Sequence, residues 1–278
     1  MNFKPFEELQ FSDDFIFGKV MKNPKICAEV IECLLKIKVD HIVYPELQKE
    51  IKPYYTSKGI RFDVYVKDSD KIFDIEIQNH KYDELPKRMR YYQSILDVDD
   101  LLRGIDYPEL KESYVIFICK GQPFDDSNLP VYDFKLNAQS SNSDESPIIL
   151  DDKAHRLVYN ASAYEQELDP KLKNFLHFVC SNESDDDFTD RLADLVKSIK
   201  QQEANKTEYN NMNLHDRDII REAKKEGRAE GARENAIETA KNMLKDNLPI
   251  EKISNYIGLS EEDIANLLKP DTSNSDAK

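Results

Sequence analysis

Two acidic residues, Asp63 and Glu76, lie on neighbouring predicted strands where they could share one cation. Residues 61–67 (RFDVYVK) and 72–78 (IFDIEIQ) alternate between apolar and polar side chains, as is typical of strands with one buried face. The polar residues between them (DSDK) predict a hairpin turn. Counting back from this turn places Asp63 directly opposite Glu76.

Carboxylates that face each other across a sheet repel unless a positive charge lies between them. Mg²⁺ and Mn²⁺ prefer oxygen ligands of this kind, and a bound ion can polarise a phosphoryl oxygen and lower the pKa of a water molecule. The pair therefore predicts a divalent metal site. The alternative interpretation is that both acids belong to the solvated face of a surface hairpin, and the spacing alone leaves it open.

Several segments besides the hairpin resemble one family. An Asp followed by a turn and then Glu-x-Gln on the next strand is similar to the core of the PD-(D/E)XK nucleases, in particular their transposase-like, or recombination-promoting, branch. The likeness covers nearly the whole chain. The other segments that resemble this family are SDDFIFGKVMKNPKICAEVIECLL (12–35), KRMRYYQSILDVDDLLRGIDYPEL (87–110), SYVIFICKGQPF (113–124), and EGRAEGAREN followed by LPIEKISNYIGLSEEDI (248–264).

The resemblance implies a metal-dependent endonuclease core. Asp63 and Glu76 would be catalytic metal ligands for Mg²⁺ or Mn²⁺, and Asp14 would supply a further acid, with Asp13 as its near competitor. Gln78 stands where many relatives carry lysine. Glutamine is neutral, so it would orient water or phosphate by hydrogen bonds alone.

A basic stretch follows the acidic pair by about ten residues and lies on a predicted helix over residues 85–102. Lys87, Arg88 and Arg90 could neutralise DNA phosphates, and Tyr91 could pack against a sugar. The alternative is a solvated helix face with tyrosines in the core.

The pattern of elements predicts an α/β fold: a restriction-endonuclease-like mixed sheet flanked by helices, with a C-terminal helical extension. A single helix is expected over 14–38, a buried strand over 114–119, and a continuation of the sheet edge over 151–161. The expected divisions are a nuclease-like core (1–163), a helical region with an acidic linker (164–215), a long charged helix with a small helix-turn-helix-like module (216–270), and a disordered tail (271–278).

Near the C-terminus, Gly227 and Gly231 lie on one face of the long charged helix expected over 216–247, so the helix could pair closely with another and form a homodimer. The alternative is a helix that merely frays at these glycines. In the following module Gly258 predicts a turn, and Ser260 with Asp263 predicts a capped helix start. Acids at that start suit protein contact better than DNA.

Overall composition limits the location and the partners of the chain. No apolar run approaches the length of a membrane span and the N-terminus lacks a secretory pattern, so we expect a cytoplasmic protein. The net charge of −15 opposes DNA binding, but residues 51–111 carry only −1 of it. The four cysteines are dispersed and form no zinc motif.

These features together predict a metal-dependent DNA endonuclease that hydrolyses phosphodiester bonds and acts in recombination or in a mobile element. The alternative is a catalytically weak protein of the same fold that binds DNA or protein. Gln78 and the acidic composition favour the alternative, whereas the intact Asp63 and Glu76 oppose it.

Overall fold

The computed structural model describes residues 4–39, 45–51, 60–81, 83–101, 106–138 and 148–267. Contacts divide the chain into two compact units, residues 1–209 and 210–278. The expected tail at 271–278 lies outside the described residues. The expected divisions at 163 and 215 stay predictions.

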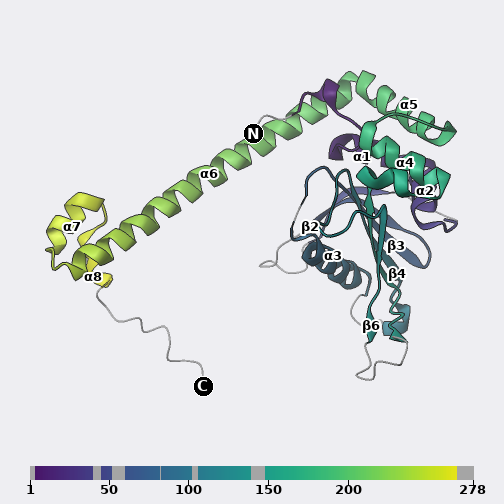
Figure 1. The fold of residues 1–278 in the computed structure, drawn as a ribbon. Helices are drawn as coiled ribbons and strands as arrows, with labels where there is room; N and C mark the ends of the chain where they lie inside the picture. Colours follow the sequence, from purple (N-terminus) through teal and green to yellow (C-terminus); the bar gives the residue numbers. More distant parts are fainter. Residues whose placement is uncertain are drawn as a thin grey trace. The chain divides into compact units, whose positions relative to one another are not determined.

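A six-stranded mixed sheet forms the centre of the first unit (Figure 1). Its order is β1–β2–β3–β4–β8–β5, with β3, β4 and β8 parallel and the other neighbours antiparallel. The predicted α/β class with a mixed sheet is confirmed. The bounds are β1 (Glu46–Ile51), β2 (Ile60–Lys67), β3 (Lys71–Gln78), β4 (Glu112–Cys119), β5 (Val131–Phe134) and β8 (Ala154–Asn160).

Two details of the expected sheet are wrong. The strand predicted over 151–161 does not form the edge, because β5 pairs with β8 on its outer side. The second strand of the hairpin, β3, is not buried on one face only. Seven of its eight residues are buried, so side chains on both of its faces are covered, and β3 lies in the sheet between β2 and β4.

Helix α3 (Leu85–Asp100) covers one face of the sheet. Its apolar residues pack against Val115, Phe117 and Cys119 of β4. Helices α1 (Asp14–Met21), α2 (Pro24–Leu35), α4 (Pro170–Ser181) and α5 (Asp187–Gln201) form a separate group away from α3 (Figure 1). This group contacts the sheet where Gly18 of α1 approaches Leu47 of β1 and where the Tyr159 hydroxyl donates to the Leu34 carbonyl.

The single helix predicted over 14–38 is two helices. Helix α1 ends at Met21. The Asn23 side chain then accepts hydrogen bonds from the backbone N–H groups of Lys25 and Ile26, and so caps a new helix that starts at Pro24. Proline at the first helical position needs no N–H partner, so the pair Asn23–Pro24 is a strong start signal. The long pattern of apolar residues hid this break.

The acidic stretch at 183–187 is a capped connection between α4 and α5 rather than a free linker. Asp186 accepts the Thr189 N–H and forms a capping box, and it also accepts a hydrogen bond from the Asn174 amide. Asp185 bonds the His177 ring. These contacts place the negative charges at the N-terminus of α5, where the helix dipole favours them.

The second unit contains most of α6 (Glu203–Lys245), then α7 (Ile250–Ile257) and α8 (Glu261–Asn266). Helix α6 starts thirteen residues before the predicted start at 216. The predicted turn and cap are confirmed: Gly258 has a φ of 72°, and the Ser260 hydroxyl accepts the Asp263 N–H. Ala240, Ile253 and Ile264 form the core of this small helical module. The remaining short elements are η1 (Phe6–Glu8), η2 (Tyr107–Glu109), η3 (Ala161–Gln166), β6 (Asn137–Ala138) and β7 (Ile148–Ile149).

Among the described residues, no helix is long and apolar enough to cross a membrane. A side chain at Gly227 or Gly231 would meet nothing within 4 Å in this structure. Pairing of two chains through this helix stays a prediction.

Candidate active site

The β2–β3 hairpin sets the geometry of the acidic pair. Its register is the predicted one, since Lys67 pairs with Ile72 and the ladder continues to Val64 and Ile75. The next step along both strands is Asp63 and Glu76. The paired ladder ends just before this step, so the two acids lie where the strands stop bonding to each other through their backbones.

Each acid then bonds to the backbone of the opposite strand. The Asp63 N–H donates to Glu76 Oε1 over 2.8 Å, and the Ile77 N–H donates to Asp63 Oδ2 over 3.1 Å. The side chains therefore occupy the positions that backbone carbonyls hold elsewhere in the ladder. These bonds fix both carboxylates and leave Asp63 Oδ1 and Glu76 Oε2 as further acceptors.

Burial makes both carboxylates reluctant to ionise. Glu76 is only 2% exposed, which rules out the interpretation of a solvated hairpin face for this residue. Burial, with the charge of Asp63 as the next cause, raises the pKa of Glu76 to about 8. The pKa of Asp63 is raised to about 7 by burial, with repulsion from Asp14 as the next cause. Groups of this kind gain from a nearby cation.

A third acid, Asp74, lies on β3 two residues before Glu76, and it had no predicted role. Asp74 is fully buried, and neither carboxylate oxygen has a hydrogen-bond donor in the structure. Burial and the neighbouring Glu76 raise its pKa well above the ordinary value. Asp74 precedes Glu76 by two residues, so strand alternation already placed both on one face of β3 and could have identified it.

Gln78 is joined to helix α3 through Arg88. Arg88 Nη1 donates to Gln78 Oε1 over 2.9 Å, and Arg88 Nη2 lies 3.8 Å from Glu76 Oε2. Nη2 also donates to the Tyr92 hydroxyl over 3.3 Å. One positive charge of α3 thus lies beside Glu76. From the sequence, a metal ion was the only positive charge expected next to the acidic pair.

The structure separates the two candidates for the additional acid. Asp13 bonds the Lys4 ammonium and the Gln10 N–H, so it holds the segment before α1 in place. Asp14 instead lines the same cleft as Asp63. Asp14 is exposed, yet partial desolvation of its carboxylate by the surrounding protein raises its pKa.

These residues meet in one open cleft of about 860 Å³ between the hairpin and α3. Among the residues predicted for the site, Asp14, Asp63, Glu76, Gln78, Lys87, Arg88 and Tyr91 line this cleft. Arg90 is exposed and does not line it. Tyr92, which like Tyr91 was considered from the sequence as a residue that could pack against a sugar, also lines it. Arg61 lines it too and had no predicted role; Arg61 is exposed, and its charge lowers the pKa of Asp63 against the effect of burial.

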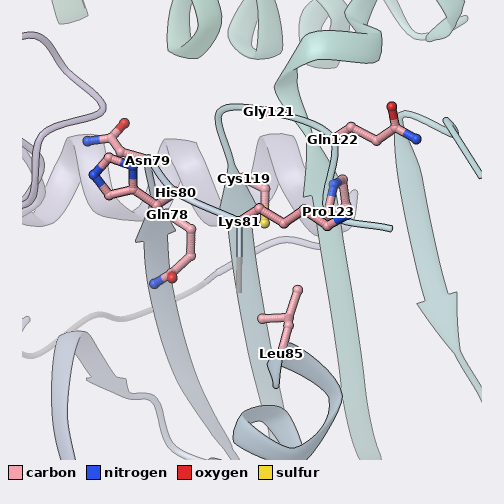
Figure 2. Close-up of a pocket in the computed structure, with 9 residues that line it drawn as sticks. All are labelled: Gln78, Asn79, His80, Lys81, Leu85, Cys119, Gly121, Gln122 and Pro123. Atoms are coloured by element: carbon pink, nitrogen blue, oxygen red, sulfur yellow. The ribbon is translucent and has the colours of Figure 1, made fainter. Parts of the chain in front are cut away.

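A second pocket adjoins the cleft at the carboxyl ends of β3 and β4 and shares Gln78 with it (Figure 2). Its volume is about 40 Å³, enough for a few water molecules only. Its polar residues are tied to the protein: the Asn79 amide donates to the Ser12 carbonyl, and Lys81 pairs with Asp125. A substrate the size of a nucleotide therefore fits the cleft and not this pocket.

The oxygen donors of the cleft suit a hard divalent ion. Among the described residues, no group of three His, Cys, Asp or Glu side chains is placed to hold a metal ion together. Mg²⁺ needs fewer, since it is commonly held by one or two carboxylates with water and substrate phosphates. Glu76, which is buried, and Asp63, which is partly buried, repel each other and could supply those carboxylates.

Comparison with known proteins identifies the family. The family model described as PD-(D/E)XK nuclease family transposase matches residues 11–240. The chain belongs to this family. The match includes the hairpin, the cleft and helix α3, and the six-stranded mixed sheet is consistent with the restriction-endonuclease-like fold of PD-(D/E)XK nucleases. Searches of curated proteins and of solved structures found no significant match.

Membership in the PD-(D/E)XK nuclease family transposases supports a nuclease-like, transposase-associated function. It confirms the predicted resemblance to this family. The roles assigned to single residues of the cleft stay predictions.

Proposed function

We propose that this protein is a metal-dependent DNA endonuclease that hydrolyses phosphodiester bonds, in recombination or in a mobile element. The observation that carries the proposal is the pair of buried Glu76 and partly buried Asp63, which lines a nucleotide-sized cleft in a chain of a nuclease family. A buried pair of acids costs folding free energy, and a functional cation would offset that cost.

Asp63 and Glu76 would hold Mg²⁺ or Mn²⁺, with Asp14 as an additional acid at the rim of the cleft. When bound, the ion supplies stabilisation of developing negative charge on the phosphate and a lowered pKa for water. Gln78 would orient water or phosphate through its side-chain amide, whose oxygen is already fixed by Arg88.

DNA would approach from the α3 side of the cleft. Lys87 is exposed and lines the cleft, and it forms no ion pair with a described residue. Its ammonium is therefore suited to bind a phosphate. Tyr91 lines the cleft beside it and offers a ring face to a sugar. Arg90 would contact the backbone outside the cleft. Arg88 has internal partners, which favour a different role.

A second candidate function is a catalytically weak member of the family that binds DNA or protein, using the C-terminal helices for partners or for pairing with a second copy. Two observations favour it. The net charge of −15 weakens attraction to DNA, and position 78 carries a neutral side chain.

Cleavage of supercoiled plasmid with Mg²⁺ or Mn²⁺ tests the proposal and separates the two candidates. We expect nicking or linearisation by the parent protein, and its loss in Asp63→Asn and Glu76→Gln. Glu109→Gln is the matched control, because Glu109 is exposed and lies on η2, away from the cleft. Cleavage that persists in Glu76→Gln, or DNA binding without cleavage, would move the function to the binding candidate.

A further inference from the structure

Three carboxyl groups, those of Asp63, Asp74 and Glu76, lie close together in the site, and the Arg88 guanidinium lies 3.8 Å from one of them, Glu76. Asp74 and Glu76 are both buried, and Asp63 is hydrogen-bonded to the backbone beside Glu76. Carboxylates packed this closely repel each other strongly unless a positive charge lies among them. The guanidinium of Arg88, 3.8 Å from Glu76 Oε2, provides that charge.

The contacts of Arg88 hold its guanidinium in one orientation. It donates to Gln78 and to the Tyr92 hydroxyl, and its central carbon lies 5.4 Å from the centre of the Phe117 ring. Arg88 and Tyr92 are four residues apart, so they lie on the same face of α3. A planar guanidinium held by hydrogen bonds and ring faces is well suited to a fixed role in a site.

Lys87, the neighbouring residue, is in a contrasting environment. It lines the same cleft but is exposed, whereas 29% of the Arg88 side chain is exposed. A phosphate bound by Arg88 would have to compete with Gln78 and Glu76 for the same N–H groups. A phosphate bound by Lys87 would not have to displace an ion-pair partner among the described residues.

We propose that Arg88 is a positioning residue of the site: it supplies the internal positive charge of the carboxylate cluster and holds Gln78 and Glu76 in place, instead of binding a DNA phosphate. This inference rests on the proposed function. It assigns the neighbouring cations of α3 to different tasks, with Arg88 acting through the site residues and Lys87 acting on the substrate.

The test compares Arg88→Gln with Lys87→Gln in plasmid cleavage and in DNA binding, the latter measured with Ca²⁺ in place of Mg²⁺. We expect Arg88→Gln to lower kcat by about 10-fold to 100-fold, while KM and DNA affinity change by less than about threefold. We expect Lys87→Gln to raise KM, to weaken DNA binding and to reduce its dependence on salt. Circular dichroism confirms that each variant is folded.

A double variant shows whether the charge itself matters. The double variant Gln78→Lys with Arg88→Gln places an ammonium at position 78 in exchange for the guanidinium beside Glu76. We expect log kcat of the double variant to regain at least about one third of the decrease that Arg88→Gln causes. If Arg88→Gln alone does not fold, Arg88→Lys takes its place, because it keeps the positive charge but loses the planar guanidinium that bonds Gln78 and Tyr92. We expect Arg88→Lys to lower kcat while DNA affinity changes by less than about threefold, and a loss of DNA affinity with unchanged kcat would overturn the proposal. No recovery in the folded double variant would overturn the proposal.

Other outcomes separate this inference from the proposed function. If Arg88→Gln weakens DNA binding as much as Lys87→Gln and keeps kcat, Arg88 is a phosphate contact and the inference is wrong. If the parent binds DNA without cleaving it, the endonuclease function fails and the binding comparison alone decides the role of Arg88. A parent that neither binds nor cleaves DNA would overturn both.

Discussion

At the scale of single residues, Glu76 has the most constrained position in the site. One of its oxygens accepts a backbone N–H of the opposite strand, and the other faces Arg88 at 3.8 Å. Burial and the neighbouring charge of Asp63 raise the pKa of its carboxyl group. The charge of Glu76 is therefore costly in the metal-free protein and useful to a bound cation.

This cost predicts how stability depends on pH without metal. The pKa of Asp63 is raised to about 7 and that of Glu76 to about 8, both above their values in the unfolded chain. The folded state then binds more protons than the unfolded state between about pH 4 and pH 8, so the free energy of unfolding falls as pH rises through this window. Each group can contribute a slope of up to about 1.4 kcal/mol per pH unit.

Urea unfolding of the parent and of Glu76→Gln at pH 5.5 and pH 8.5, in chelator, measures this effect. Neutral glutamine removes one titrating group, so we expect a smaller loss of stability between the two pH values in the variant. At pH 8.5 the variant should be the more stable protein. A parent that is equally stable at both pH values, or that gains stability at pH 8.5 relative to the variant, would contradict the raised pKa values.

At the scale of elements, short polar signals define helix starts that the apolar pattern does not show. Asp186 caps α5 through the Thr189 N–H, in a stretch whose acidic composition suggested a linker. We expect Asp186→Ala to lower the free energy of unfolding by about 1 kcal/mol. Its neighbour Asp187, exposed and without a capping bond, is the matched control, and Asp187→Ala should cost less than about 0.5 kcal/mol. Chemical denaturation measures both, and equal losses in the two variants would contradict the capping role.

The hairpin could be predicted from the sequence because its signal is local. Alternation and a polar turn fix the register of Asp63 and Glu76 within a few residues along the chain. The burial of β3 on both faces could not be predicted in this way, because it depends on β4 and on α3, which are distant in sequence. The contact between Arg88 and Gln78 depends on the same packing of α3 against the sheet.

The edge of the sheet was missed for a related reason. A strand over residues 151–161 gives a clear local pattern, but nothing local indicates that the short β5 will pair on its outer side. Similarly, the break between α1 and α2 depends on one capping residue, Asn23, in a stretch whose apolar residues keep helical spacing on both sides of it. Long-range pairing and single caps are the parts that the sequence pattern leaves undetermined.

At the scale of the whole molecule, the cleft belongs entirely to the first unit. The residues that line it lie between positions 14 and 92, whereas the second unit begins at residue 210. The helical module has its own small core around Ala240, Ile253 and Ile264. The two units should therefore fold without each other.

A chain shortened to residues 1–212 tests this independence. It retains Tyr209, whose hydroxyl donates to the Lys4 carbonyl. We expect one cooperative thermal transition, with a midpoint within about 5 °C of the corresponding transition of the full chain. Loss of cooperative unfolding in the shortened chain would show that the first unit needs the C-terminal helices.

The measurement that tests the central claim most directly is calorimetric titration of Mn²⁺ into the parent, Glu76→Gln and Glu109→Gln, because metal binding does not require the correct DNA substrate. If Asp63 and Glu76 form the metal site, the parent and Glu109→Gln should bind one ion with the same affinity, and Glu76→Gln should bind at least about tenfold more weakly. Equal binding by Glu76→Gln, or no binding by the parent, would contradict the assignment of a metal-dependent centre to this hairpin.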